Sequence, residues 1–332
     1  MVALSLRFDL RNPEFAATTS SERVRAAVDM AAWAEARAGG VAVSLSEHHG
    51  SPDGYLPCPV LLATAVAART TTMRIAIGAV IAPFYDPIRL AEDLAFLDAL
   101  SEGRIDLVLG SGYRAEEFEM FGVAASERGR RTEEVVEVLR KAWTGEPFDY
   151  RGRTVRVTPR PHRPGGPPLV LGGNSAAAAR RAARIADGFA PYKAEDWAVY
   201  RAETLRLGKP DPGDHPGGAL RPTTFLADDP EEAWADLLPY FLHDNNSYAE
   251  WLEDASDGTA GPYARSTPDA LRASGRYRIL TPEAYVEDLR SQGAGARAHF
   301  EPMVGGVPPD LGWATLELYE QRVLPALTAA PS

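Results

Sequence analysis

The sequence has a single cysteine, Cys58, so it lacks the means to form an internal disulfide or a zinc site built on several thiolates. It also lacks an excess of basic residues, because 35 Lys and Arg stand against 46 Asp and Glu and give a formal net charge of −11. That charge argues against broad contact with nucleic acid or with an anionic membrane surface, since both need Lys and Arg to meet phosphate groups. The composition favours a small-molecule substrate.

Long apolar runs are missing as well. No stretch approaches the ~18 consecutive apolar residues that a membrane-spanning helix requires. The opening segment, MVALSLRFDLRNPEF, carries Arg7 and Asp9 and lacks the apolar core of a secretory leader. We therefore expect a soluble, cytoplasmic protein.

What the sequence does contain is a regular alternation of short β-branched runs and helical patterns. Eight such units in a chain of 332 residues predict an α/β protein with a (β/α)8 TIM barrel, formed as one domain over residues 1–332, rather than an open sheet. The predicted strands are residues 2–10, 40–47, 74–82, 105–110, 169–171, 188–191, 223–227 and 299–304.

One connection is longer than a barrel loop needs to be. Residues 228–280 follow the seventh predicted strand as an insertion. Loops that follow barrel strands lie at the catalytic end, so this insertion is a candidate lid, and the alternative is a solvent-exposed decoration. Its aromatic residues are Trp234, Tyr240, Phe241, Tyr248 and Trp251.

Glu47, His48 and His49 stand where the second predicted strand gives way to a loop, which is the catalytic end of a barrel strand. Consecutive side chains of an extended chain point to opposite faces, so the adjacent histidines are poorly placed to share a metal ion. We predict no metal site. We predict instead that His48 transfers a proton, with the carboxylate of Glu47 beside it, while the alternative is an ordinary polar strand end.

Two glycine-containing turns are candidate ligand sites. Gly110 and Gly112 follow the fourth strand, and their lack of a Cβ lets a planar or phosphorylated ligand approach, although the full dinucleotide-binding motif is absent. Gly173 precedes Ser175, which begins an alanine-rich helix whose free N–H groups are predicted to bind a phosphate. The alternative for the second turn is a plain capped helix. Arginines that could neutralise the phosphate are Arg114, Arg128 and Arg180.

These segments, taken in order, resemble the bacterial luciferase-like flavin-dependent monooxygenases, a family of (β/α)8 barrels. The motifs that carry the resemblance are EHH, DPIRLAEDLAFLDALSEGRIDLVLGSGY, EEFEMFGV and GGNS, followed near the end by RILTPEAYVEDL and HFEPMVGG. The resemblance extends over essentially the whole chain.

The resemblance implies that reduced FMN lies across the mouth of the barrel and reacts with O2 as a C4a-peroxyflavin to oxygenate a small apolar carbonyl or aromatic substrate. It implies a separate flavin reductase that supplies FMNH2, a homodimer, a catalytic role for His48 and a non-proline cis peptide within residues 78–80. The residues implied to contact the flavin are Gly78, Ala79, Val80, Gly110, Ser111, Gly112, Tyr113, Arg128, Gly173, Asn174, Ser175 and Ala176.

Two positions depart from the light-emitting members of that family. Ser111 stands where they place an arginine on the phosphate, and Ala178 replaces a threonine, so the resemblance does not imply light emission. Arg114 and Arg128 are the possible substitutes for the missing charge. Two alternatives stay open: an F420-dependent hydride-transfer oxidoreductase, and a non-catalytic flavin-binding protein.

Overall fold

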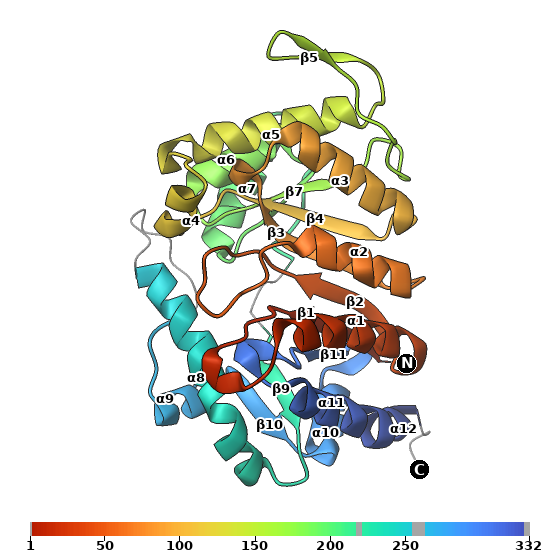
Figure 1. Cartoon of the computed structure of the whole chain (residues 1–332), viewed down its shortest axis with the longest axis vertical. Helices are drawn as coiled ribbons and strands as arrows, with labels where there is room; N and C mark the ends of the chain where they lie inside the picture. The colour runs from red at the N-terminus through yellow and green to blue at the C-terminus, as the bar shows by residue number, and fades with distance from the viewer. Residues whose placement is uncertain (1, 217–220, 254–262, 329–332) are drawn as a thin grey trace.

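The computed structural model describes residues 2–216, 221–253 and 263–328, and Figure 1 shows strands surrounded by helices. Every pairing between the barrel strands is parallel, which confirms the predicted (β/α)8 barrel class. The strands at the predicted positions are β1 (Ala3–Phe8), β2 (Gly40–Leu45), β3 (Arg74–Ile81), β4 (Ile105–Gly110), β7 (Leu169–Gly172), β8 (Gly188–Ala190), β9 (Thr223–Leu226) and β11 (Arg297–Phe300).

The backbone hydrogen-bond ladder of the barrel is in two parts. A seven-stranded sheet runs in the order β11-β1-β2-β3-β4-β7-β8, and a two-stranded sheet joins β9 to β10 (Tyr277–Leu280). Side chains connect β9 to β11, because Thr223 Oγ1 donates to Glu301 Oε1 at 3.2 Å and Arg221 Nη1 donates to the Arg297 carbonyl at 3.1 Å. We call this interruption between β9 and β11 the seam.

The strand β10 was not among the predicted strands, so the strand list is corrected here. Its run Tyr-Arg-Ile-Leu has four residues and directly precedes Thr281, the N-cap of the next helix. A run this short carries no periodicity of its own, and its pairing with β9 makes it a strand.

Capping residues in the sequence account for where several helices begin. Thr19 and Glu22 form a capping box before α1, Asp86 accepts the N–H groups of Ile88 and Arg89 before α3, and Pro59 is the first residue of α2. The helices are α1 (Ser20–Arg37), α2 (Pro59–Arg69), α3 (Pro87–Leu100), α4 (Ala115–Met120), α5 (Arg128–Ala142), α6 (Ala176–Ile185), α7 (Ala194–Arg206), α8 (Pro230–Glu253), α9 (Pro268–Ala273), α10 (Pro282–Ser291), α11 (Pro309–Leu318) and α12 (Leu324–Thr328). A hairpin of β5 (Phe148–Tyr150) and β6 (Arg153–Val155) extends from the barrel (Figure 1).

Alternate residues of the strands divide between two environments. In β1, Leu4, Leu6 and Phe8 are buried in the main hydrophobic core, which also contains residues of α1 and α2. On the other face of β1, Ser5 Oγ lies 2.9 Å from His299 Nδ1 and Arg7 Nη1 donates to Glu301 Oε2 at 2.5 Å. Polar groups therefore line this side of the barrel, next to the seam.

The insertion predicted at residues 228–280 contains the helix α8, which runs beside the loops at one end of the strands (Figure 1). Gly305 fixes its position: φ is +60° there, and a Cβ would stand 2.2 Å from the Tyr240 carbonyl oxygen of α8, so only glycine fits. Residues 254–262 of the insertion lie outside the described residues. No helix in the described ranges is both long and apolar enough to cross a membrane.

Candidate active site

His48 lies just beyond the end of β2, and its side chain is buried. Its Nδ1 stands 2.9 Å from Glu117 Oε1 on α4, and its backbone N–H donates to the Leu56 carbonyl at 3.2 Å. The same Glu117 oxygen accepts the His49 N–H at 2.9 Å and Arg114 Nη1 at 3.3 Å. One carboxylate therefore holds both the ring and the backbone of the histidine pair.

The protonation states of this pair follow from burial and hydrogen bonding. Burial lowers the pKa of His48, although the Glu117 carboxylate acts in the opposite direction. Burial alone would raise the pKa of Glu117, but the hydrogen bonds from His48 and from the His49 N–H, with the charge of Arg114, bring it below the ordinary value. A neutral His48 next to an ionised carboxylate carries its proton on Nδ1. Its Nε2 is then unprotonated and accepts a hydrogen bond from the Tyr113 hydroxyl at 3.5 Å.

Glu47 contacts His49 and not His48, which departs from the pairing expected from the sequence. Its Oε1 lies 2.7 Å from His49 Nε2 and accepts the Tyr85 hydroxyl at 3.1 Å, while Oε2 accepts the Ile81 N–H at 3.1 Å. Burial raises the pKa of Glu47, and these hydrogen bonds only partly offset the rise. Glu47 thus fastens the loop after β2 to the end of β3.

Glu117 is the residue that sequence reasoning missed. It lies within the EEFEMFGV segment that carried the family resemblance, and this was the only available signal for it.

Aromatic rings enclose the imidazole of His48. We call this set the aromatic enclosure, and two of its members, Tyr248 and Trp251, come from α8. The guanidinium carbons of Arg11 and Arg114 lie 4.5 and 4.1 Å from the Trp251 ring centroid, which adds cation–π contacts. The ring centroids lie 4.9 Å from His48 for Tyr55, 5.6 Å for Tyr113, 6.1 Å for Tyr248 and 4.7 Å for Trp251.

The ends of β3 and β4 lie together beside this histidine. The non-proline cis peptide expected within residues 78–80 is present between Gly78 and Ala79. A Cβ on Gly110 would stand 3.1 Å from the Ala79 Cβ, so the turn after β4 packs directly on the cis peptide. Gly112 has φ of +74°, and a Cβ there would stand 3.0 Å from Ile81. The structure therefore brings these predicted flavin contacts into one place.

The turn after β7 forms the predicted start of α6. Ser175 is the N-cap, and its Oγ accepts the Ala178 N–H at 3.2 Å. Asn174 Oδ1 accepts the Tyr192 N–H at 3.0 Å, and a Cβ on Gly173 would stand 2.6 Å from the Ala178 Cβ. The N–H of Ala176 belongs to the first turn, where helix geometry leaves donors without an intrahelical acceptor.

The arginines proposed for phosphate neutralisation have different surroundings. Arg114 is buried beside His49 and Glu117, and its Nη1 donates to the His49 carbonyl at 2.9 Å. Its positive charge is therefore paired with Glu117 next to the histidines. Arg128 begins α5, and its carbonyl accepts Thr132 Oγ1, which in turn lies 3.1 Å from Ser111 Oγ. Arg180 is exposed on α6. Only the first of the three is thus drawn into the His48 cluster.

The residues present fit a flavin mononucleotide at both of its ends. The open N–H groups and the Ser175 hydroxyl at the start of α6 match an anionic phosphate. The glycine turn and the cis peptide offer a planar ring a surface with little side-chain bulk, and the unprotonated Nε2 of His48, which accepts the Tyr113 hydroxyl, is a proton acceptor beside it. The arrangement can therefore bind a phosphorylated planar ligand and exchange a proton with it or with a molecule beside it.

A family model described as luciferase-like monooxygenase matches residues 9–290. The chain is 27% identical over 266 residues to limonene 1,2-monooxygenase of Rhodococcus erythropolis, which covers 74% of this chain and 66% of that protein. It is 30% identical over 140 residues to the oxygenase component of the flavin-dependent trigonelline monooxygenase of Acinetobacter baylyi, over 40% of this chain and 39% of that protein. The chain spans less than half the length of several curated relatives, between 40% and 46%.

Solved structures share the fold over nearly the whole chain. The FMN complex of the oxygenating constituent of 3,6-diketocamphane monooxygenase from Pseudomonas putida has a TM-score of 0.69 and 20% identity, over 99% of both chains. An F420-dependent secondary alcohol dehydrogenase in complex with an F420-acetone adduct has a TM-score of 0.62 and 16% identity, also over 99% of both chains. At these identities the likeness is one of fold.

Proposed function

This chain belongs to the luciferase-like monooxygenase family, and we propose that it is a monooxygenase that uses reduced FMN and O2 to oxygenate a small apolar carbonyl or aromatic substrate. The observation that carries the proposal is the neutral His48, held by Glu117, whose Nε2 lies 3.5 Å from the hydroxyl of Tyr113 in the segment after β4 that packs on the Gly78–Ala79 cis peptide. The monooxygenase relatives support the reaction class, and the oxygenase component among them supports a separate reductase as the source of FMNH2.

In this proposal, different residues bind the phosphate and the isoalloxazine ring of FMN. Ser175 and the Ala176 N–H bind the phosphate, and Gly173 and Asn174 shape the turn before α6. The remaining predicted contacts lie along the isoalloxazine ring. Bound reduced FMN supplies the electrons that activate O2. His48 Nε2 takes or returns the proton at the reacting atoms, and the aromatic enclosure keeps water away from them. The flavin contacts along the ring are Gly78, Ala79, Val80, Gly110, Ser111, Gly112 and Tyr113, with Arg128 near the phosphate.

The cofactor is tested by titrating the protein with reduced FMN and, separately, with reduced F420, and then adding O2 and candidate carbonyl substrates. Binding of reduced FMN with substrate-dependent oxygen consumption is the expected result. Hydride transfer from reduced F420 without oxygen consumption would instead establish the F420 alternative, which the shared fold of the F420-dependent dehydrogenase keeps open. Binding of flavin without turnover on any substrate would favour the non-catalytic alternative.

Replacing Ser175 by alanine is expected to weaken FMN binding about tenfold, since it removes one hydrogen bond to a charged phosphate. Fluorescence titration measures the change. The matched control is Thr281→Ala, which removes another N-cap, at α10, where Thr281 accepts the Ala284 N–H. Both variants lose a cap and about 0.5 to 2 kcal/mol of stability. If Thr281→Ala weakened FMN binding equally, the effect would come from stability and not from the phosphate.

We also propose that the insertion at residues 228–280 acts as a lid, because α8 contributes two rings of the aromatic enclosure. Deleting residues 256–266 is expected to raise the fraction of oxygen released as hydrogen peroxide, since water then reaches the site. Peroxide and product are measured together in the same reaction. An unchanged ratio of product to peroxide would exclude the lid. Residues 256–262 of this segment lie outside the described residues.

A homodimer through α2 and α3 is the proposed assembly. Large apolar side chains on these helices face solvent: Leu61 is 70% exposed on α2, and Phe96 is 58% exposed on α3. Sedimentation velocity measures the mass of the particle directly, and a monomer at micromolar concentration would exclude the assembly.

A further inference from the structure

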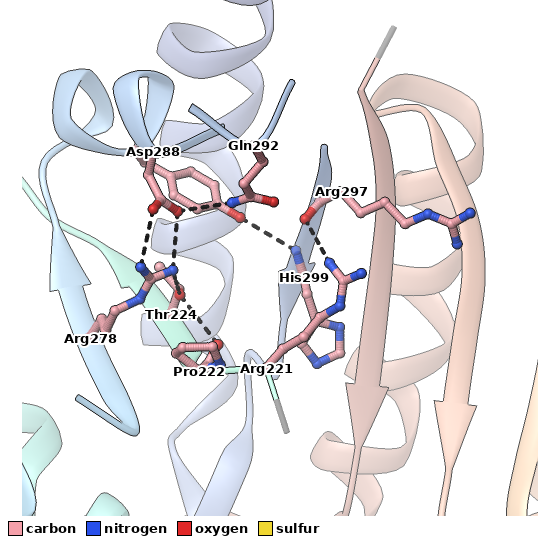
Figure 2. A pocket seen from close by; sticks show the side chains of 9 residues that line it. Arg221, Pro222, Thr224, Arg278, Asp288, Gln292, Arg297 and His299 are labelled. Carbon is pink, nitrogen blue, oxygen red and sulfur yellow. Dashed lines mark hydrogen bonds and ion pairs between the residues drawn. The ribbon is translucent and has the colours of Figure 1, made fainter. Parts of the chain in front are cut away.

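A cavity of about 360 Å³ lies at the end of the barrel opposite His48, on the seam between β9 and β11 (Figure 2). Arg221 and Pro222 of its wall precede β9 and Arg297 begins β11, whereas His48 follows the far end of β2. Because the strands are parallel, the first residues of β9 and β11 lie at the end of the barrel away from the end of β2 that carries His48. None of the residues assigned to flavin or substrate lines this cavity.

The cavity occupies the place that a neighbouring strand would fill. The backbone N–H of His299 donates to the Tyr285 hydroxyl at 3.4 Å, and the Arg297 carbonyl accepts Arg221 Nη1 at 3.1 Å. Side chains of the cavity wall therefore satisfy the outer edge of β11. The cavity wall is therefore polar, and its remaining donors and acceptors must form hydrogen bonds with solvent or with a ligand.

Two guanidinium groups, those of Arg221 and Arg278, face the cavity from opposite walls (Figure 2). Arg278 is paired with Asp288 at 3.2 Å, and its Nε is buried without a hydrogen-bond partner. Arg221 forms no ion pair within the described ranges, and its one hydrogen bond goes to a neutral carbonyl. The Arg297 side chain points away from the cavity in Figure 2. In a chain with a net charge of −11, this leaves an unneutralised cation at a cavity with a second guanidinium across it.

The geometry points to a binding site for a small oxyanion, a carboxylate or phosphate group held between Arg221 and Arg278. Guanidinium groups bind such anions through paired N–H donors. Within the described residues, Arg221 uses one N–H in a hydrogen bond to a carbonyl and has others left to donate. The terminal nitrogens of Arg278 already donate to Asp288 and Thr224 and its Nε is buried, so Arg278 contributes its positive charge at the opposite wall. The imidazole of His299 on β11 and the amide of Gln292 at the end of α10 also line the cavity (Figure 2). The Asp288 carboxylate is part of the same lining and accepts Gln292 Nε2 at 3.2 Å. This site is independent of the proposed monooxygenase reaction.

The test is calorimetric titration of the full chain with inorganic phosphate and, separately, with acetate, after saturation with FMN so that the start of α6 is already filled. Binding of phosphate or acetate is expected, and the tighter of the two identifies the source of the oxyanion. Arg221→Gln is expected to weaken binding about tenfold or more, because it removes charged hydrogen bonds. The matched control, Arg297→Gln, removes the same charge from a side chain that points away and is expected to leave the affinity within about threefold.

Three results would overturn the assignment. One is the absence of binding at millimolar anion. Another is equal weakening by Arg221→Gln and Arg297→Gln, which would reduce the effect to general electrostatics. The third is binding that occurs only without FMN, which would place the anion at α6. Arg221 and Arg297 are both exposed, so neither variant threatens the fold.

Discussion

Replacing His48 by alanine is expected to lower kcat by about 10²- to 10⁴-fold, the contribution of a positioned general acid or base, while the affinity for reduced FMN stays nearly unchanged. The reason is that the unprotonated His48 Nε2 is the proton acceptor of the site, whereas the proposed phosphate contacts lie at the start of α6. Steady-state oxygenation gives kcat, and anaerobic titration gives the affinity.

A second variant separates chemistry from folding. His48→Gln retains a side chain that can donate to Glu117 but has no basic nitrogen, so it should fold like the wild type and be as inactive as His48→Ala. His162→Ala removes an exposed histidine elsewhere and should leave kcat unchanged. Loss of flavin binding with the fold preserved would show that His48 serves the cofactor and not proton transfer.

Replacing Glu117 by glutamine is expected to lower kcat about 10- to 100-fold, part of the contribution that a correctly placed base makes. Glu117 touches neither substrate nor cofactor in our proposal and acts by fixing the Nδ1 proton of His48, so it is a positioning residue. Its carboxylate also raises the pKa of His48 against the effect of burial.

The pH profile tests this role. Activity needs the neutral imidazole, so it falls as the pH drops through the pKa of His48, which lies below the ordinary value. Without the Glu117 carboxylate this pKa falls further, and the acid limb of the Glu117→Gln profile moves to lower pH. Glu116→Gln, one residue away on the same helix and exposed, should change neither kcat nor the limb. A lower kcat with an unmoved limb would reduce Glu117 to a structural support.

The barrel could be predicted from sequence because its signals are local. Asp86 and Pro87 mark the start of α3, and Ser175 marks that of α6, by chemistry that needs no distant partner. The strand β10 could not be predicted in this way, since four residues without periodicity become a strand only by pairing with β9, which lies 54 residues earlier in the chain.

The site was predictable where one strand sufficed. Side chains alternate along an extended chain, a rule that we applied to the histidine pair but not to Glu47. The same rule places Glu47 and His49 on one face and His48 on the other, in line with the observed Glu47–His49 contact and against the predicted pairing of Glu47 with His48. Finding Glu117 needs the fold, because 69 residues separate it from His48. The sequence does not reveal which glutamate of α4 turns toward the histidine.

The seam between β9 and β11 has a consequence for local opening of the barrel. A ring whose amides are bonded all the way round protects them until the whole domain unfolds. Here β9 and β10 are bonded to each other but share no backbone ladder with β8 or with β11, and a side-chain bond from Thr223 to Glu301 links β9 to the end of β11. This pair can therefore separate from the other strands without breaking their ladder. In a native-state hydrogen-exchange experiment, we expect the amides of β9 and β10 to exchange together, and faster than the amides of β1 to β4.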